Sequence, residues 1–200
     1  MTDTFDRAYW EDRYGAPGLT WSGAPNAVLV TEASDLAPGR ALDIGSGEGG
    51  DALWLAQRGW NVTGIDISQN ALDKARDRLE SIDATAAARV EWQQRDLTTW
   101  TPAPATFDLV TAHFMHLPRA ARDILFPSLA AAVAPGGTLL IVGHDVSAHH
   151  AHDDDLMFGV DEVVAAMGGL TVEVAESRER VDVAMRDIVV RATRGRDIHP

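Results

Sequence analysis

The sequence predicts one compact α/β domain, built on a single doubly wound, mostly parallel seven-stranded sheet. Three observations lead to this fold class. Apolar, β-rich runs alternate with segments of helical spacing, which is typical of repeated βα units. A glycine-rich loop directly follows the first of these runs. The length of 200 residues matches one domain with its own core.

Five apolar runs predict the parallel strands, and they cover residues 41–44, 62–65, 90–93, 107–110 and 138–142. Two further alternating runs, residues 170–175 and 181–192, are separated by only five residues. Such a short connection allows a hairpin but not a parallel crossover. We therefore expect the last strand to be antiparallel to a neighbour.

Helical spacing between these runs predicts a helix that ends at Gly59 and a second helix that is capped by Ser68. A third helix is expected from about residue 118 to residue 133, because Pro135 cannot continue it. Further helices are expected over residues 5–14, 24–36 and 161–167.

The chain before the first strand is rich in aromatic residues, among them Trp10, Tyr14 and Trp21. We expect residues 1–39 to form an N-terminal helical cap on a core of residues 40–200. The aromatic side chains either pack as core or form a lid over a ligand, in which case residues 1–23 would be mobile until the ligand binds.

Composition excludes several functions. The net charge of −13 makes it hard to assemble a phosphate-neutralising surface, so nucleic acids and anionic membranes are not expected partners. The absence of cysteine excludes disulfides, thiolate metal sites and a cysteine nucleophile. The first residues lack the pattern of a signal peptide, and no apolar run is long enough to span a membrane. We expect a cytoplasmic protein, whose oligomeric state the sequence does not indicate.

A segment rich in histidine and aspartate, residues 149–155, has the residue types of a metal site. Consecutive residues do not easily converge on one ion, and a solvated acidic loop needs no ligand. We therefore expect a mobile loop and no metal.

The glycine loop contains Gly45, Gly47 and Gly50, which satisfy the G-x-G-x-x-G spelling of a dinucleotide-binding loop. Asp66 follows at the end of the second strand, 21 positions after Gly45. There its carboxylate can accept hydrogen bonds from both hydroxyls of a ribose. This spacing suits NAD and S-adenosylmethionine equally.

Three details favour S-adenosylmethionine. Asp43 places a carboxylate two residues before the first glycine, which suits the cationic amino group of a methionine moiety better than a pyrophosphate. Asp96 and Leu97 close the third strand, where a side-chain acceptor and a backbone amide can hold an adenine edge. A dinucleotide fold also begins close to its chain terminus, whereas here a cap comes first.

With these motifs the sequence resembles the class I S-adenosylmethionine-dependent methyltransferases. The segments D-I-G-S-G-E-G, G-I-D-I-S, R-D-L and A-P-G-G occur in the order and spacing of that family between about residues 40 and 145. The cap motif W-E-D-R-Y, with Trp21-Ser22-Gly23, resembles the small tellurite-resistance and thiopurine methyltransferases. The loop after the fourth strand reads A-H-F-M-H, without the Asn/Asp-Pro-Pro-Tyr/Phe of enzymes that methylate adenine or glutamine amides, so those activities are not expected.

The resemblance implies a role for each matching residue. Gly45, Ser46 and Gly47 would line the methionine part of the donor, and Asp66 would hold the ribose. The remaining contacts would come from Ile67 on the adenine face, Asp96 and Leu97 at the adenine amino group and N1, and Trp21 or Arg13 closing the site.

Methyl transfer from a sulfonium is an in-line displacement, so the protein mainly aligns the reacting atoms. A hydroxyl or a protonated amine would also need a base, and His113 and His144 follow the fourth and fifth strands, at the ligand-binding edge of such sheets. Each is either a base or a residue that packs against the cofactor or holds a loop. A pair between His144 and Asp145 is disfavoured because adjacent strand residues point to opposite faces.

The sequence thus predicts a methyltransferase that uses S-adenosylmethionine and releases S-adenosylhomocysteine. Its acceptor is expected to be a small molecule with a soft sulfur, selenium or tellurium nucleophile, or a nitrogen nucleophile. Two alternatives remain open at this point: an NAD-dependent oxidoreductase with the same loop and ribose carboxylate, and a non-catalytic S-adenosylmethionine-binding module.

Overall fold

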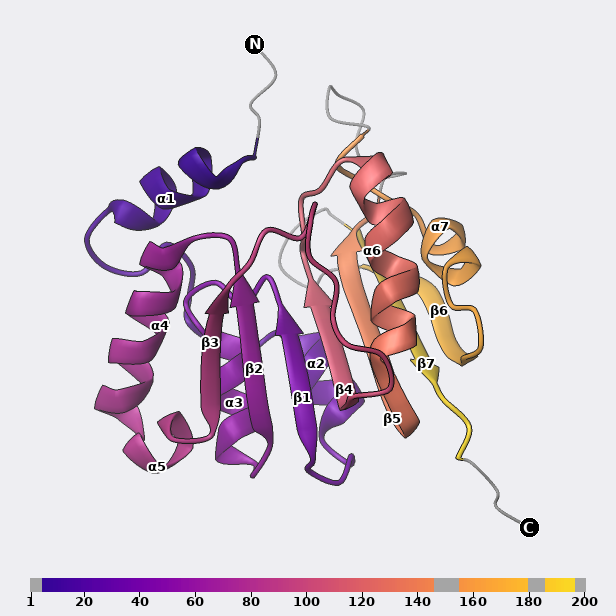
Figure 1. The fold of residues 1–200 in the computed structure, drawn as a ribbon, viewed down its shortest axis with the longest axis horizontal. Helices are drawn as coiled ribbons and strands as arrows, with labels where there is room; N and C mark the ends of the chain where they lie inside the picture. Colours follow the sequence, from indigo (N-terminus) through magenta and orange to yellow (C-terminus); the bar gives the residue numbers. More distant parts are fainter. Residues whose placement is uncertain (1–4, 146–154, 180–185, 197–200) are drawn as a thin grey trace. The chain divides into compact units, whose positions relative to one another are not determined.

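The computed structural model describes residues 5–145, 155–179 and 186–196. The chain divides into two compact units, residues 1–100 and residues 101–200. Each unit is drawn with its helices and strands labelled in Figure 1. The expected boundary between a cap and a core at residue 39 stays a prediction.

The first unit has three parallel strands in the order β3-β2-β1. The strands are β1 (Arg40–Ile44), β2 (Asn61–Asp66) and β3 (Val90–Gln94). They are connected by α3 (Gly50–Gln57), α4 (Gln69–Ile82) and α5 (Ala84–Ala87). The sequence predicted α3 and α4, and Ser68 caps α4 as expected, since its Oγ accepts the N–H of Ala71 at 3.2 Å.

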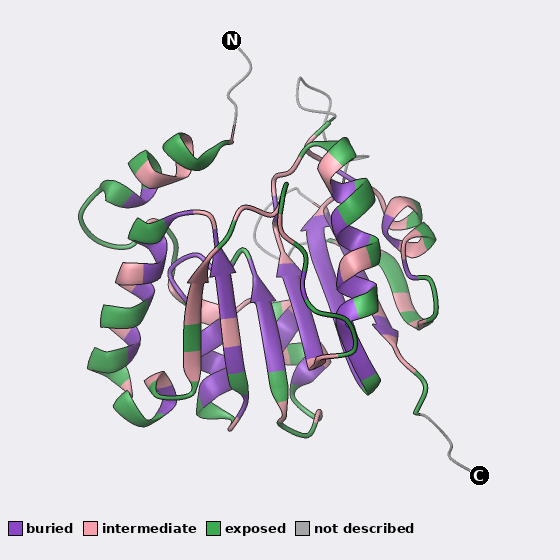
Figure 2. Ribbon diagram, viewed as in Figure 1, coloured by how far each residue is buried: buried purple, intermediate pink, exposed green. Residues whose placement is uncertain are grey.

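Burial follows the hydrophobic pattern in this unit. Figure 2 shows β1 and β2 mostly buried, whereas α4 buries one face and exposes the other. The buried face of α4 carries Leu72 and Leu79, which lie about two turns apart along the helix. The short helix α5 was not predicted, because four residues give no hydrophobic period.

The N-terminal part of the first unit contains α1 (Arg7–Gly15) and α2 (Ala27–Ala33). Helix α2 lies within the helix predicted over residues 24–36, and α1 extends one residue beyond the helix predicted over residues 5–14. Asp6 and Asn26 are their N-cap residues. Helix α1 lies close to the start of α4 (Figure 1). This contact brings the aromatic residues of α1 toward the glycine loop.

The second unit has four strands in the order β4-β5-β7-β6. They are β4 (Phe107–His113), β5 (Val133–His144), β6 (Thr171–Glu179) and β7 (Arg186–Thr193). Strand β4 pairs with β5 in parallel, whereas β7 is antiparallel to both β5 and β6. The helices are α6 (Arg119–Ala132) and α7 (Val160–Ala165).

Two local expectations in this unit were wrong. Strand β5 begins at Val133 rather than at residue 138, and its pairing with β4 shifts register because residues 134–137 bulge out. Pro135 has no N–H to pair and Gly136 adopts a φ of 80°, which explains the bulge. The helix expected over residues 161–167 begins at Val160 and ends at Ala165.

The predicted fold class is confirmed in its α/β character, its seven strands, their mostly parallel direction and the antiparallel last strand. Among the described residues, no helix is both long and apolar enough to cross a membrane. The expected loop of residues 149–155 lies outside the described residues, apart from Asp155.

Candidate functional site

The glycine loop between β1 and α3 has a backbone that only glycine adopts easily. Gly45 and Gly47 have φ values of 69° and 50°. A Cβ atom at Gly47 would lie 3.1 Å from Oη of Tyr14. The loop is also tied to the sheet, since the N–H of Ser46 donates to the carbonyl of Ile65 at 2.9 Å. Because Gly45 and Gly47 have no side chains, the backbone of the loop stays accessible at these two positions.

Asp66 lies at the end of β2 and is buried. Its carboxylate accepts the N–H of Gly47 and the N–H of Ser68, each at 2.9 Å. Burial raises the pKa of Asp66, while these amide hydrogen bonds act in the opposite direction. A carboxylate has about four acceptor positions, so Asp66 retains the capacity to accept further donors.

A buried hydroxyl lies beside this carboxylate in the loop. Ser46 is 9% exposed, and its Oγ has no hydrogen-bond partner among the residues that the structure describes. Asp43, at the end of β1, is buried as well. Buried polar groups are normally hydrogen-bonded, so the Ser46 hydroxyl fits a site that is completed by a ligand.

The segment between α1 and α2 is held to the loop by Glu48. This buried carboxylate accepts the N–H of Thr20 at 2.9 Å and the N–H of Trp21 at 3.1 Å. The indole N–H of Trp21 donates to Oη of Tyr14 at 3.0 Å, and the guanidinium of Arg13 lies 4.8 Å from the Trp21 ring centre. Arg13, Tyr14 and Trp21 thus form one group next to Gly47.

The hydroxyl of Tyr14 stays protonated in this group. Burial raises its pKa, and the carboxylates of Asp66 and Glu48 raise it further.

The far end of the site is formed by the residues after β2 and β3. The backbone N–H of Arg95 donates to the carbonyl of Asp66 at 2.9 Å, which joins the two strand ends. Ile67 is half-buried and its carbonyl accepts Nε2 of Gln94 at 2.9 Å. Asp96 accepts both the N–H and the hydroxyl of Thr98, and the hydroxyl bond lowers its pKa. Asp96 is half-buried, as is the adjacent Leu97.

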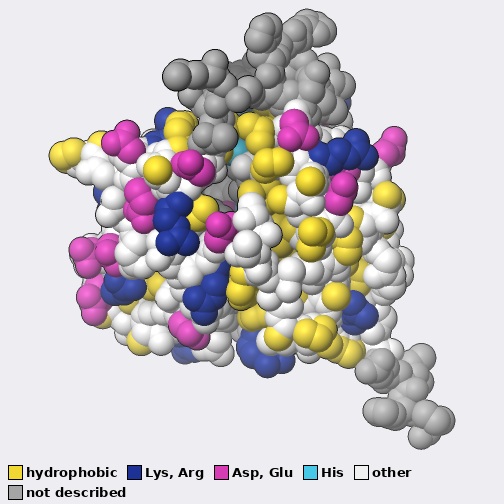
Figure 3. All heavy atoms as spheres, turned by 45° about the horizontal axis from the view of Figure 1, so that its top comes forward, with side chains coloured by type: hydrophobic (Ala, Val, Ile, Leu, Met, Phe, Trp, Pro, Cys, Tyr) yellow, Lys and Arg dark blue, Asp and Glu magenta, His cyan; other side chains and the backbone are white. Residues whose placement is uncertain are grey.

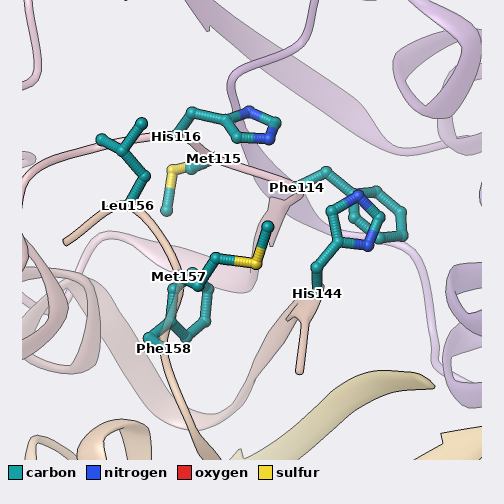
Figure 4. A pocket seen from close by; sticks show the side chains of 7 residues that line it. All are labelled: Phe114, Met115, His116, His144, Leu156, Met157 and Phe158. Carbon is teal, nitrogen blue, oxygen red and sulfur yellow. The ribbon is translucent and has the colours of Figure 1, made fainter. Parts of the chain in front are cut away.

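A second feature lies in the second unit, where β4 and β5 end. A small hollow, open to solvent, is lined by residues 114–116, His144 and residues 156–158. Figure 4 shows the rings of Phe114 and His144 side by side, with the thioether of Met157 pointing toward them. His113, the last residue of β4, is half-buried and is not one of the residues that line this hollow.

The two histidines of the hollow lie near each other, with ring centres 6.3 Å apart for His116 and His144. Nδ1 of His144 lies 3.0 Å from Oδ1 of Asp187 on β7, in a hydrogen bond. Asp145 does not take this place, because its carboxylate accepts the hydroxyl of Ser177 instead. The partner of His144 is therefore a residue 43 positions away in the sequence.

Comparison with known proteins indicates a family. A model of the methyltransferase domain matches residues 41–137. Methyltransferase GfsG of Streptomyces halstedii is 31% identical over 186 residues, which cover 91% of this chain and 63% of that protein. The chain is similar to the class I S-adenosylmethionine-dependent methyltransferases.

Two further comparisons agree with this similarity, one in sequence and one in fold. A probable thiol methyltransferase of Arabidopsis thaliana is 28% identical over 173 residues, 84% of this chain and 68% of that protein. The structure of an S-adenosylmethionine-dependent methyltransferase from Methanosarcina mazei has a TM-score of 0.70 at 18% identity, covering 87% of this chain and all of that one. The chain spans less than two thirds of the length of GfsG.

Most of the predicted cofactor residues belong to the first unit, whereas His113 belongs to the second. The structure connects Gly47 to Asp66, joins the ends of β2 and β3, and places Trp21 against Arg13. A buried hydroxyl without a partner among the described residues and a carboxylate with acceptor capacity suit the polar groups of S-adenosylmethionine. The residues present therefore fit the cofactor of the family.

Sequence reasoning missed several residues that organise this candidate site. Glu48 lies inside the glycine motif, but its partners Thr20 and Trp21 are far away in the sequence. The sequence analysis interpreted Gly50 only as the last glycine of the G-x-G-x-x-G motif. In the structure a Cβ there would lie 2.7 Å from the carbonyl oxygen of Ala24, so contact with the cap demands this glycine.

Proposed function

We propose that this chain transfers a methyl group from S-adenosylmethionine to a small-molecule acceptor. The observation that carries the proposal is the contact between Asp66 and Gly47, which holds a buried carboxylate against the glycine loop. This loop contains the Ser46 hydroxyl, which has no hydrogen-bond partner in the described part of the chain. The family to which the chain is similar uses this cofactor.

The residues have separate tasks in this proposal. Gly45, Ser46 and Gly47 receive the methionine part of the donor, with the carboxylate of Asp43 near its amino group. Asp66 accepts from the ribose with the acceptor capacity that its amide hydrogen bonds leave. The adenine contacts come from Ile67, Asp96 and Leu97, and the stacked pair of Arg13 and Trp21 covers the site.

When it is bound, S-adenosylmethionine supplies a methyl group already activated by the positive charge on sulfur. The chain then has to exclude water and align the acceptor. Hydrogen bonds connect Trp21 to the protonated hydroxyl of Tyr14 and to the buried carboxylate of Glu48. These three side chains form a rigid wall that excludes water and aligns the acceptor. Such a wall positions reactants without taking part in proton transfer.

The acceptor is a small molecule with a soft sulfur, selenium or tellurium nucleophile, or a nitrogen nucleophile. A relative that is named as a probable thiol methyltransferase supports the sulfur class. The resemblance of the cap to the tellurite-resistance and thiopurine enzymes points in the same direction.

Charge supports a small acceptor over a nucleic acid. The chain has a net charge of −13, and Figure 3 shows acidic and basic side chains interspersed on the face it draws. A cytoplasmic location remains a prediction.

Calorimetric titration with S-adenosylmethionine, S-adenosylhomocysteine and NAD tests the proposal. We expect both sulfur compounds to bind and NAD not to bind, in line with the family match, which does not favour the oxidoreductase alternative. Turnover on a panel of thiols and amines then tests catalysis. Binding without any turnover on the panel would support a non-catalytic S-adenosylmethionine-binding module instead.

A further inference from the structure

An ion pair connects the glycine loop to α4 within the first unit. Nζ of Lys74, on α4, lies 3.5 Å from Oε1 of Glu48, in the loop, and the two side chains are 24% and 2% exposed. A buried carboxylate needs a charged partner and hydrogen bonds to offset the loss of water. Lys74 lies outside the glycine motif, and the proposed function assigns it no task.

Lys74 holds one stretch of the segment that follows α1. Its Nζ donates to the backbone carbonyl of Ala16 at 2.6 Å and to that of Gly18 at 2.7 Å. An ammonium group has three donors, and the carboxylate of Glu48 is its third partner. A single side chain of α4 therefore fixes the chain where it leaves α1.

Glu48 holds the next stretch of the same segment. Its carboxylate accepts the N–H of Thr20 at 2.9 Å and the N–H of Trp21 at 3.1 Å. The indole N–H of Trp21 donates in turn to Oη of Tyr14, and a Cβ at Gly47 would lie 3.1 Å from this oxygen. A continuous series of contacts thus leads from the ion pair to the surface of the glycine loop.

We infer that Glu48 and Lys74 act as one clamp, which keeps Trp21 and Tyr14 against the glycine loop and thereby retains the methionine end of the bound donor. The inference rests on the donor site of the proposed function, in which the glycine loop receives this end of S-adenosylmethionine. The ribose and the adenine are assigned to the residues after β2 and β3. Glu48 and Lys74 are positioning residues, because they act through the two aromatic side chains.

The clamp acts on affinity through preorganisation. A ligand that binds only the closed arrangement has its affinity reduced by the fraction of chains that are closed. Without the clamp, residues 16–21 lose the charged partners of four backbone groups and open more often. Arg78 still donates to the carbonyl of Gly23 at 2.8 Å, and Glu11 still accepts the N–H of Asn70. Loss of the clamp therefore loosens residues 16–21 and leaves their two ends attached.

Two ligands that differ at the methionine end test the inference. S-adenosylhomocysteine carries the amino acid group, whereas 5′-methylthioadenosine has the same adenine, ribose and thioether without it. Lys74→Met keeps the apolar stem and removes the charge. In calorimetric titrations we expect it to weaken S-adenosylhomocysteine binding by about 10-fold and 5′-methylthioadenosine binding by less than about 2-fold. Lys74→Arg keeps the charge and should recover part of the affinity.

A double substitution tests whether the two residues act as one unit. Glu48→Gln keeps an acceptor for the cap amides but removes the charge that faces Lys74. Because both substitutions break the same clamp, Glu48→Gln combined with Lys74→Met should weaken S-adenosylhomocysteine binding by little more than either substitution alone.

Hydrogen exchange without any ligand supplies a readout that does not depend on binding. The N–H groups of Thr20 and Trp21 should exchange at least about 10-fold faster in Lys74→Met than in the wild-type chain. The buried positions of α4, among them Leu72 and Leu79, should keep their protection, which shows that the helix itself is intact.

The matched control is Arg76, a second cation of α4. It pairs with the exposed carboxylate of Asp73 at 2.7 Å within the helix. Arg76→Met should leave both affinities and the exchange of the Thr20 amide unchanged. A loss of S-adenosylhomocysteine affinity equal to that in Lys74→Met would mean that any positive charge on α4 suffices, and would overturn the clamp.

The outcomes separate the inference from the proposed function. The clamp is overturned by equal losses for the two ligands in Lys74→Met, by an unchanged affinity, by unchanged exchange or by independent effects in the double substitution, and the proposed function then stands. A wild-type chain that binds S-adenosylhomocysteine but methylates none of the thiols and amines overturns the proposed catalysis alone. A wild-type chain that binds neither ligand overturns both.

Discussion

The carboxylate of Glu11, in α1, accepts the backbone N–H of Asn70, in α4, at 3.0 Å, although the two residues are 59 positions apart. The same carboxylate accepts the N–H of Gln69 at 2.8 Å and the hydroxyl of Ser68 at 2.9 Å. The first N–H groups of a helix have no partner within the helix and form its positive end. A side chain of one helix therefore completes the cap of another and fixes α1 next to the candidate cofactor site.

Removal of this carboxylate is expected to destabilise the chain. Glu11→Ala leaves the N–H groups of Gln69 and Asn70 without their acceptor, so we expect a loss of about 1 to 2 kcal/mol in the free energy of unfolding. Urea unfolding measures this loss. Asp12→Ala, at the exposed neighbouring position, is the control and should change stability by less than about 0.5 kcal/mol. Equal effects of the two substitutions would argue against the interhelical cap.

The same contact predicts a pH dependence. Burial raises the pKa of Glu11, but the hydrogen bonds from Asn70, Gln69 and Ser68 outweigh it, and the net pKa is below the ordinary value of 4.5. A lowered pKa means that the folded chain binds the proton less readily than the unfolded chain. This contribution to stability is complete above about pH 4.5 and is lost as the pH falls through the lower pKa of the folded state. Unfolding of Glu11→Gln at a series of pH values should lack this component.

Asp66 is expected to carry a large part of the donor affinity. Hydrogen bonds to a charged group contribute about 1.5 to 3 kcal/mol, so Asp66→Ala should weaken S-adenosylmethionine binding by about 10- to 100-fold. Calorimetric titration measures this change. Asp73→Ala removes an exposed carboxylate that pairs with Arg76 and should leave the affinity unchanged. An unaltered affinity in Asp66→Ala would remove the assignment of the ribose site.

Hydrogen exchange distinguishes a packed cap from a lid. The N–H groups of Thr20 and Trp21 donate to the buried carboxylate of Glu48 in a structure without ligand. We therefore expect both amides to be protected to a similar degree with and without S-adenosylhomocysteine. Protection that arises only when S-adenosylhomocysteine is added would support the lid, in which residues 1–23 close over the donor.

Arg122 is expected to stabilise the chain segment of residues 155–158, which lines part of the hollow. This buried guanidinium pairs with Glu162 at 2.7 Å and donates to the backbone carbonyls of Leu117, Asp155 and Met157. Loss of one partner of a buried pair costs about 3 to 5 kcal/mol, and we expect Arg122→Met to cost about 3 kcal/mol because Glu162 is partly exposed. Urea unfolding measures the loss.

The control for Arg122 is the neighbouring Arg119, whose ion pair with Asp123 is exposed and spans 4.0 Å. Arg119→Met should cost less than about 1 kcal/mol. Adding Glu162→Gln to Arg122→Met should recover part of the loss, since no carboxylate is then left without its cation. A cost below about 1 kcal/mol for Arg122→Met would show that the guanidinium does not stabilise the segment of residues 155–158.

The local periodicity of the sequence determined the elements that position the candidate site. The alternation of apolar runs predicted the strands, and Ser68 predicted the start of α4 as its N-cap residue. The G-x-G-x-x-G motif together with Asp66 predicted the cofactor loop. These features depend on residues a few positions apart, whose spacing on a strand or a helix follows from backbone geometry. The bulge at residues 134–137 was missed because it depends on how β5 pairs with β4.

Only the tertiary structure decided which distant side chains meet. Glu11 caps α4, Glu48 holds Thr20 and Trp21, and Asp187 supports His144. The sequence offered Asp145 as the neighbour of His144, but the pleat of the strand turns adjacent side chains to opposite faces. The register between β5 and β7 brings Asp187 to the imidazole instead, because residues directly opposite on paired strands share a face. Register and helix docking depend on packing across the whole unit, which no local pattern records.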